Sequence, residues 1–141
     1  MNMMQEALCM CCSDITRYKR KSQEVSNKIR LLKGVITCQN INNEEYKEFE
    51  RKFHHKIYIL QNDKMHCHFM CGECRKAKTN ELSIKEDQLG ELLWKVFFLI
   101  YSTGDERLYH NTLRILQGDY PITYRNLEQL WYLRKKVCVN E

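Results

Sequence analysis

Residues 83–101 read SIKEDQLGELLWKVFFLIY and include the most apolar run of the chain. The first four residues, Ser83 to Glu86, form a capping box, in which the serine and glutamate side chains satisfy free amides at a helix start. The apolar residues that follow recur at helical spacing: Leu89, Leu92, Leu93, Val96, Phe97 and Ile100. Phe98 and Leu99 widen this apolar surface, so we expect a central helix from Ser83 to about Tyr101.

Two shorter helices are expected after the central one. The first follows capping residues 103–106 and ends before Gly118, and the second follows Pro121. Their core positions are also apolar at helical spacing: Leu108, Leu113, Leu116, Leu127, Leu130, Trp131 and Val137. Residues 83–138 therefore predict a C-terminal helical bundle.

A further helix is predicted between Asp14, a capping residue, and Gly34, which suits the turn after a helix. Apart from Ser22, one side of this segment is apolar: Ile15, Tyr18, Val25, Ile29 and Leu32. From residue 17 to residue 33 there are seven bases against one acid, and the bases are Arg17, Lys19, Arg20, Lys21, Lys28, Arg30 and Lys33. A basic helix face attracts phosphate backbones or acidic proteins, although a solvated helix face has the same composition.

The segment between these helical parts predicts β-structure together with one short helix. Residues 35–38 are β-prone, and Asn42 or Asn43 can cap a helix that runs to about Phe53. Residues 56–60 and 65–70 read as two short strands joined by turn residues 61–64. They predict a β-hairpin that leads directly into the cysteines at 71 and 74.

The eight cysteines point to metal. No secretory signal is visible, so we expect an intracellular, reducing compartment in which disulfides do not persist. Cys9 and Cys12 form one C-x-x-C pair, and Cys71 and Cys74 form another. Two such pairs can supply the four thiolates of one structural zinc, and a closed set of four cysteines leaves no position for a reacting water. The predicted zinc ligands are Cys9, Cys12, Cys71 and Cys74.

The ligand set has alternatives. Cys11 can replace either cysteine of the first pair. A second site, or a substitution in the first, can draw on the following residues: His66, Cys67, His68 and Cys38. As isolated cysteines, Cys38 and Cys138 are better explained as core residues. His54 and His55 are expected at a solvated helix end.

These cysteines give the chain a resemblance to the RING family. The pair at 9 and 12 resembles the opening pair of a RING, and residues 66–74, HCHFMCGEC, resemble its central run. The closing ligand pair of a RING is missing after Cys74, so the chain resembles a degenerate RING or U-box-like module. The resemblance implies a RING-like, treble-clef zinc half-site over residues 9–80. The predicted fold is thus α+β and mostly α, with the C-terminal helical bundle after this half-site.

The chain also resembles, in length and in its lone half-site, U-box/RING-like proteins of baculoviruses that act in nucleocapsid assembly. This resemblance implies a viral protein of the host nucleus and the virion, with capsid or assembly proteins as partners. We therefore expect a non-enzymatic structural protein, stabilised by one zinc, that acts through protein–protein contacts. Two alternatives stay open: a ligase module that recruits an E2 enzyme, and a nucleic-acid-binding zinc protein that uses the basic helix 17–33.

Length and composition set the remaining bounds. The chain has 141 residues, of which 43% are hydrophobic, and a net charge of +5. This length predicts one domain spanning residues 1–141. No run approaches the roughly 18 apolar residues of a membrane span, so we expect no membrane partner. No nucleophile triad, nucleotide loop or H-E-x-x-H motif is present, so no catalytic residue is predicted.

Overall fold

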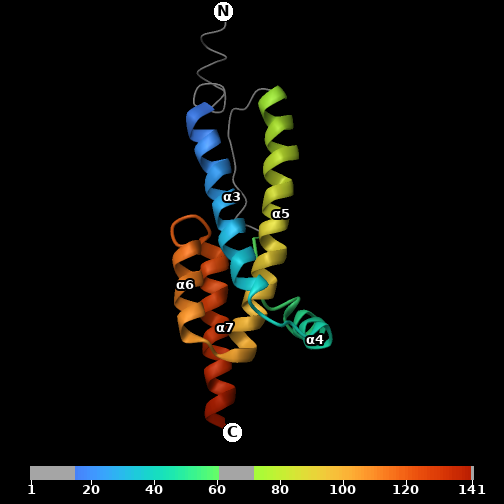
Figure 1. Cartoon of the computed structure of the whole chain (residues 1–141), viewed down its shortest axis with the longest axis vertical. Helices are drawn as coiled ribbons and strands as arrows, with labels where there is room; N and C mark the ends of the chain where they lie inside the picture. Colours follow the sequence, from blue (N-terminus) through green and yellow to red (C-terminus); the bar gives the residue numbers. More distant parts are fainter. Residues whose placement is uncertain (1–14, 61–71, 141) are drawn as a thin grey trace, which may run out of the picture.

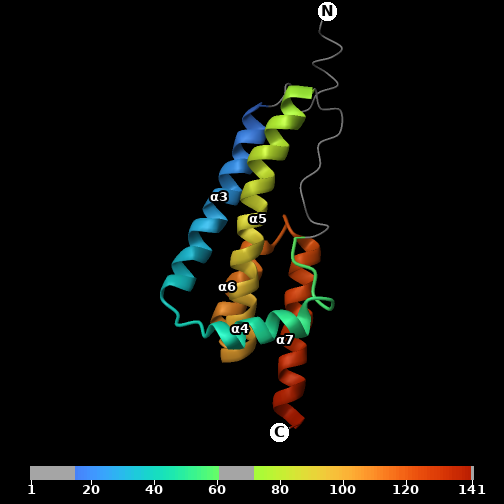
Figure 2. The same ribbon diagram turned by 90° about the vertical axis from the view of Figure 1, so that its right-hand side faces the viewer.

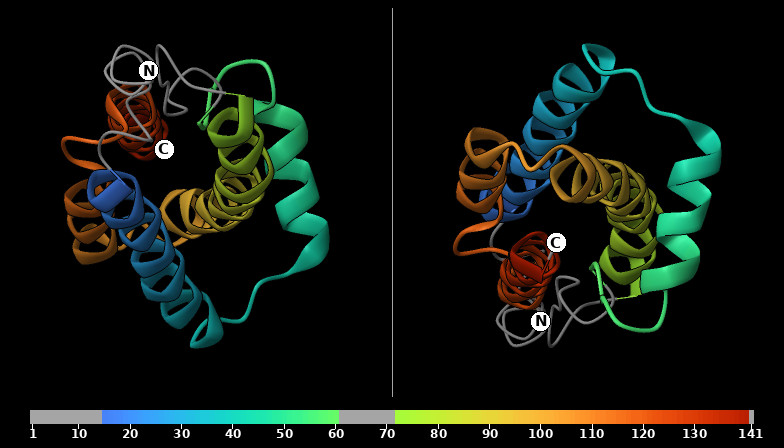
Figure 3. Two further views of the ribbon diagram at one scale, coloured as in Figure 1. Left: turned by 90° about the horizontal axis from the view of Figure 1, so that it is seen from above. Right: turned by 90° about the horizontal axis from the view of Figure 1, so that it is seen from below.

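The computed structural model describes the backbone of residues 15–60 and 72–140, and the side chains of residues 22–60 and 84–136. These residues form five helices: α3 (Ile15–Thr37), α4 (Asn43–Phe53), α5 (Gly72–Thr103), α6 (Glu106–Leu116) and α7 (Pro121–Asn140). Helices α3 and α5 run parallel, side by side, and start at the same end of the molecule (Figure 1). Helices α6 and α7 form an antiparallel pair beside the second halves of α3 and α5, and α4 crosses the outer side of α5 (Figures 2 and 3).

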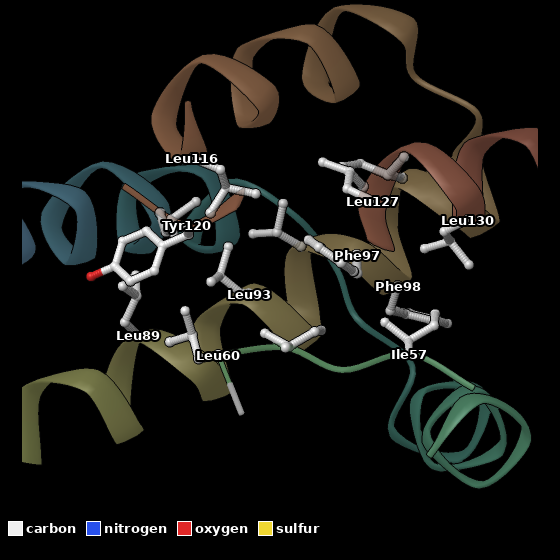
Figure 4. Packing of buried hydrophobic residues seen from close by; sticks show 14 of the residues in the cluster. Ile57, Leu60, Leu89, Leu93, Phe97, Phe98, Leu116, Tyr120, Leu127 and Leu130 are labelled. Atoms are coloured by element: carbon white, nitrogen blue, oxygen red, sulfur yellow. The ribbon is translucent and has the colours of Figure 1, made fainter. Parts of the chain in front are cut away.

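The second half of α5 is the centre of the core, as predicted from its apolar run. Five consecutive residues, 96–100, are buried. They are covered on all sides because α3, α6 and α7 pack against one part of the helix, and the aromatic face of α4 packs against another. Figure 4 shows α5 side chains facing those of the loop and α7 in this core; they include Leu93, Phe97, Phe98, Ile57 and Leu127.

Several predicted helix ends are confirmed. The Asn42 side chain accepts hydrogen bonds from the amides of Glu44 and Glu45 at the start of α4. At the start of α6, the Asp105 side chain accepts from the amide of Leu108. Short side-chain acceptors of this kind satisfy amides that have no partner within the helix.

The connection between α5 and α6 is held by Arg134 of α7. Its Nε atom donates to the carbonyl oxygen of Tyr101, 3.0 Å away, in the last turn of α5. The guanidinium lies where a Cβ atom on Gly104 would be, and Gly104 has a φ of +69°. Glycine is therefore favoured at this turn both by its left-handed backbone and by the close approach of an arginine.

The predicted β-prone segment 35–38 is wrong, because α3 continues through Gly34 to Thr37. The Thr37 hydroxyl donates to the Lys33 carbonyl oxygen at 2.7 Å, one helical turn earlier. Ile36 extends the apolar stripe of α3 and packs against the core. Burial of Ile36 therefore outweighs the β-propensity of this segment.

The α+β fold class is also wrong for the described residues, which contain no strand. Ile57 and Ile59 are buried and Tyr58 between them is exposed, but Leu60 is also buried, so the alternation of a strand stops at Ile59. Two amides of residues 57–60 bond to a helix: the amide of Tyr58 donates to Asn126 Oδ1 at 3.2 Å, and that of Leu60 donates to Thr123 Oγ1 at 3.0 Å. Side chains of α7 thus supply acceptors that a second strand would supply in the predicted RING-like hairpin; residues 65–70 lie outside the described part.

The capping box at Ser83 does not start the central helix, because α5 begins at Gly72. Glu86, its predicted glutamate, lies in the interior of α5 and is only 4% exposed. The sequence break between the predicted parts 9–80 and 83–138 consequently falls within one continuous helix.

Substitution of Thr123 by valine tests the anchoring of residues 57–60. Valine keeps the shape of threonine but offers no acceptor to the buried amide of Leu60. The backbone of Leu60 has a φ of 63°, which is unfavourable for any residue with a Cβ atom, so the segment depends on this anchor. We expect a loss of about 1–3 kcal/mol in the free energy of unfolding, measured by urea denaturation. Thr37→Val, at an exposed hydroxyl, serves as the control and is expected to change stability by less than about 0.5 kcal/mol.

Candidate metal centre

The predicted zinc ligands lie at the starts of two helices. Cys12 precedes the first residue of α3 by three positions, and Cys71 immediately precedes Gly72 of α5. Cys74 is in the first turn of α5, where the structure describes the backbone alone. Cys9, Cys12 and Cys71 lie outside the described residues.

The register of the two helices is set by a direct contact near these starts. Lys85 Nζ on α5 donates to Ser22 Oγ on α3 at 2.6 Å. Ser22 is the polar residue that interrupts the apolar stripe of α3, and it is buried. The polar interruption in the stripe therefore marks the place where α3 and α5 are bridged by a hydrogen bond.

The rise per residue of an α-helix gives the length of helix between the Ser22–Lys85 hydrogen bond and each helix start. Ile15 lies about 10 Å from Ser22 and Cys74 about 16 Å from Lys85, at about 1.5 Å per residue. Counted back from this hydrogen-bonded pair, Cys74 is thus about 6 Å farther along its own helix than Ile15 is along α3. The three residues from Cys12 to Ile15 span at most about 10 Å. The chain is therefore long enough to bring Cys12 level with Cys74.

The other predicted ligands divide into three groups. Cys11 and residues 66–68 lie outside the described part of the chain, and the side chain of Cys138 is not described. Cys38 is exposed just after α3, so its interpretation as a core residue is wrong. His54 and His55 are exposed after the end of α4, as predicted.

Within the described residues, no group of three or more histidine, cysteine, aspartate or glutamate side chains is placed to hold a metal ion. His110 faces Glu106 one turn away on α6, with Nε2 and Oε1 3.8 Å apart, and both residues are exposed. A single histidine–carboxylate pair of this kind is a surface contact. The cysteine pairs are thus the metal-binding candidates of this chain.

The basic residues of α3 differ in their surroundings. Lys28 forms a 2.8 Å ion pair with Asp119, and its side chain is only 13% exposed. Arg30 donates to Asn27 Oδ1, and Lys33 is exposed. Lys28 is therefore a structural link to the α6–α7 turn, which the sequence pattern did not indicate because Asp119 is 91 residues away.

A polar groove of about 330 Å³ lies between α4 and α5 and is lined in part by Tyr46, Glu50 and Glu91. Burial, followed by repulsion from the carboxylates of Glu50 and Glu91, raises the pKa of the Tyr46 hydroxyl. Burial and the Glu128 carboxylate likewise raise the pKa of Tyr109. Both phenols stay protonated at neutral pH and are poor candidates for acid–base chemistry.

Comparison of the chain with protein-family models, curated proteins and solved structures gave no match. Of the helices in the described ranges, none combines the length and the apolar character that crossing a membrane requires.

Proposed function

We propose that this protein is a non-enzymatic structural protein in which one zinc ion clamps the starts of α3 and α5. The ligands are Cys9, Cys12, Cys71 and Cys74, with Cys11 as a substitute within the first pair. The observation that carries the proposal is the parallel arrangement of α3 and α5. It brings the starts of the two helices to one end of the molecule, and each C-x-x-C pair adjoins one of these helix starts in sequence.

The shape of the molecule gives such a clamp a physical role. We call residues 15–24 of α3 and 72–85 of α5 the arm. Helices α6 and α7 lie beside the second halves of α3 and α5, so the arm extends beyond them (Figures 1 and 2). A metal clamp at the far end would tie the two helices of the arm together beyond α6 and α7.

The chemistry of the ligands supports a structural role. Four thiolates around zinc form a closed tetrahedral set with no open position for water or substrate. The binding free energy of such an ion is then folding free energy, because the ligands have no preformed arrangement in the unfolded chain. In the proposed function, zinc holds the arm in its folded arrangement, and the protein acts by binding partner proteins.

The opposite end of the molecule supports action through protein–protein contacts. The last turns of α7 project beyond the bundle (Figure 1). In the second half of α7, Tyr132 and Leu133 are 69% and 44% exposed, close in sequence to the exposed bases Lys135 and Lys136. Exposed aromatic and aliphatic side chains beside charge are typical of protein interfaces.

Zinc content per chain tests the proposal. Elemental analysis of protein purified without chelator is expected to give one zinc for the wild type and none for Cys71→Ser/Cys74→Ser. Cys38→Ser is the matched control, because Cys38 is exposed and outside the proposed ligand set, and it is expected to retain one zinc. A folded wild type without zinc, or a double variant that keeps its zinc, would refute the clamp.

A further inference from the structure

Positive charge is concentrated in the first two turns of α3 and of α5. Residues 15–21 contain four bases and no acid, and residues 72–78 contain three bases and one acid. These fourteen residues therefore carry a net charge of +6, whereas the whole chain carries +5. The rest of the molecule is close to neutral.

The fold brings these two segments together. Helices α3 and α5 run parallel, so their first turns lie at the same end of the arm (Figures 1 and 2). The hydrogen bond between Lys85 and Ser22 joins the two helices one residue after the α3 segment and seven residues after the α5 segment. We call residues 15–21 and 72–78 the basic tip. Arg75, Lys76 and Lys78 belong to it, although the sequence pattern associated basic function only with the helix of residues 17–33.

Some bases elsewhere in the described part have partners within the protein. Lys28 pairs with Asp119, and Arg51 lies 3.2 Å from Glu48. Arg134 donates to the Tyr101 carbonyl oxygen. Charge that is neutralised internally contributes little to an external field. Since the basic tip carries +6 and the rest of the chain −1, the tip has the greatest excess of positive charge available to a polyanion.

We propose that the basic tip binds the sugar–phosphate backbone of double-stranded nucleic acid without sequence preference. Duplexes carry a dense, regular line of phosphates, and binding to them follows from lysine and arginine alone. Single strands are recognised largely by stacking of bases on aromatic side chains. The tip contains Tyr18 as its single aromatic residue, so the composition favours the duplex.

Two variants that lose the same positive charge distinguish binding by the basic tip from attraction to the overall charge of the protein. The tip variant is Arg75→Gln/Lys76→Gln/Lys78→Gln. The control variant removes three exposed bases of α7, outside the basic tip: Arg125→Gln/Lys135→Gln/Lys136→Gln. Both variants keep all the cysteines. The zinc content and the thermal unfolding of each variant therefore test the proposed zinc clamp independently of duplex binding.

Binding is measured by fluorescence anisotropy with a short labelled DNA duplex of mixed sequence, over salt from about 50 to 200 mM. The tip variant is expected to bind at least about tenfold more weakly at low salt, and its slope of log Kd against log salt is expected to fall by about one per lost phosphate contact. The control variant is expected to match the wild type in both respects.

Three results would overturn the proposal. One is equal weakening by the two variants, which would indicate overall charge. Another is the absence of duplex binding by the wild type at about 50 mM salt, where phosphate contacts are strong. The third is binding to vesicles of anionic lipid with no binding to the duplex, which would identify a membrane surface as the polyanion.

Discussion

Removal of zinc is expected to open the arm while the core stays folded. The arm extends beyond α6 and α7, and short helices without such packing are marginal in water. A ligand at about 1,000 times its Kd stabilises the bound state by about 4 kcal/mol. Amide exchange in residues 15–21 and 72–83 is therefore expected to accelerate by about a thousandfold on chelation.

Hydrogen-exchange mass spectrometry resolves this local opening from global unfolding. Peptides from residues 89–100 are the internal control, since Leu89, Leu93 and Phe97 are fully buried in the core away from the cysteines. They are expected to keep their protection in chelator. Equal acceleration over both regions would mean that zinc holds the whole fold together, and unchanged exchange in the arm would mean that no metal clamps it.

The helices of the C-terminal half were predictable because local signals and tertiary packing agree there. The caps at Asp105 and Asn42 have the geometry expected from their sequence. The apolar run around Phe98 correctly indicated a helix buried on more than one side. In each case a residue a few positions away supplies the partner, so the sequence pattern contains the interaction.

The failures arise where the partner is distant in sequence. Residues 57–60 have the composition of a strand, but Asn126 and Thr123 of α7 accept two amide hydrogen bonds from this segment. Similarly, the capping residue Ser83 lies within α5, and Gly34 lies within α3. A capping residue or a glycine can end a helix but can also lie inside one, because good packing of the flanking residues outweighs the local preference.

In the candidate site, too, the local features were predictable from the sequence and the contacts between distant segments were not. The C-x-x-C spacing marks the cysteine pairs within the sequence, but it does not show that α3 and α5, whose starts these pairs adjoin in sequence, run parallel. The ion pair between Lys28 and Asp119 could not be predicted, since no local pattern joins residues so far apart. Charge counted along one helix consequently overestimated the availability of Lys28 to an external partner.

Truncation of Phe97 is expected to be the most destabilising single core substitution in the described part. Phe97 is fully buried and is the largest of the completely inaccessible side chains. It lies between α5 and the leucines of α7, where the well-packed helices cannot collapse into the space that alanine would leave (Figure 4). Phe97→Ala is expected to lower the free energy of unfolding by about 3–5 kcal/mol.

Urea denaturation followed by circular dichroism measures this loss, and Ile84→Ala on the same helix is the matched control. Ile84 is 67% exposed, so its truncation is expected to change stability by less than about 0.5 kcal/mol. The difference between the two variants isolates burial from any change in helix propensity, because both replace a larger side chain by alanine within α5. A loss below about 1 kcal/mol for Phe97→Ala would mean that α7 does not close over α5 at this position.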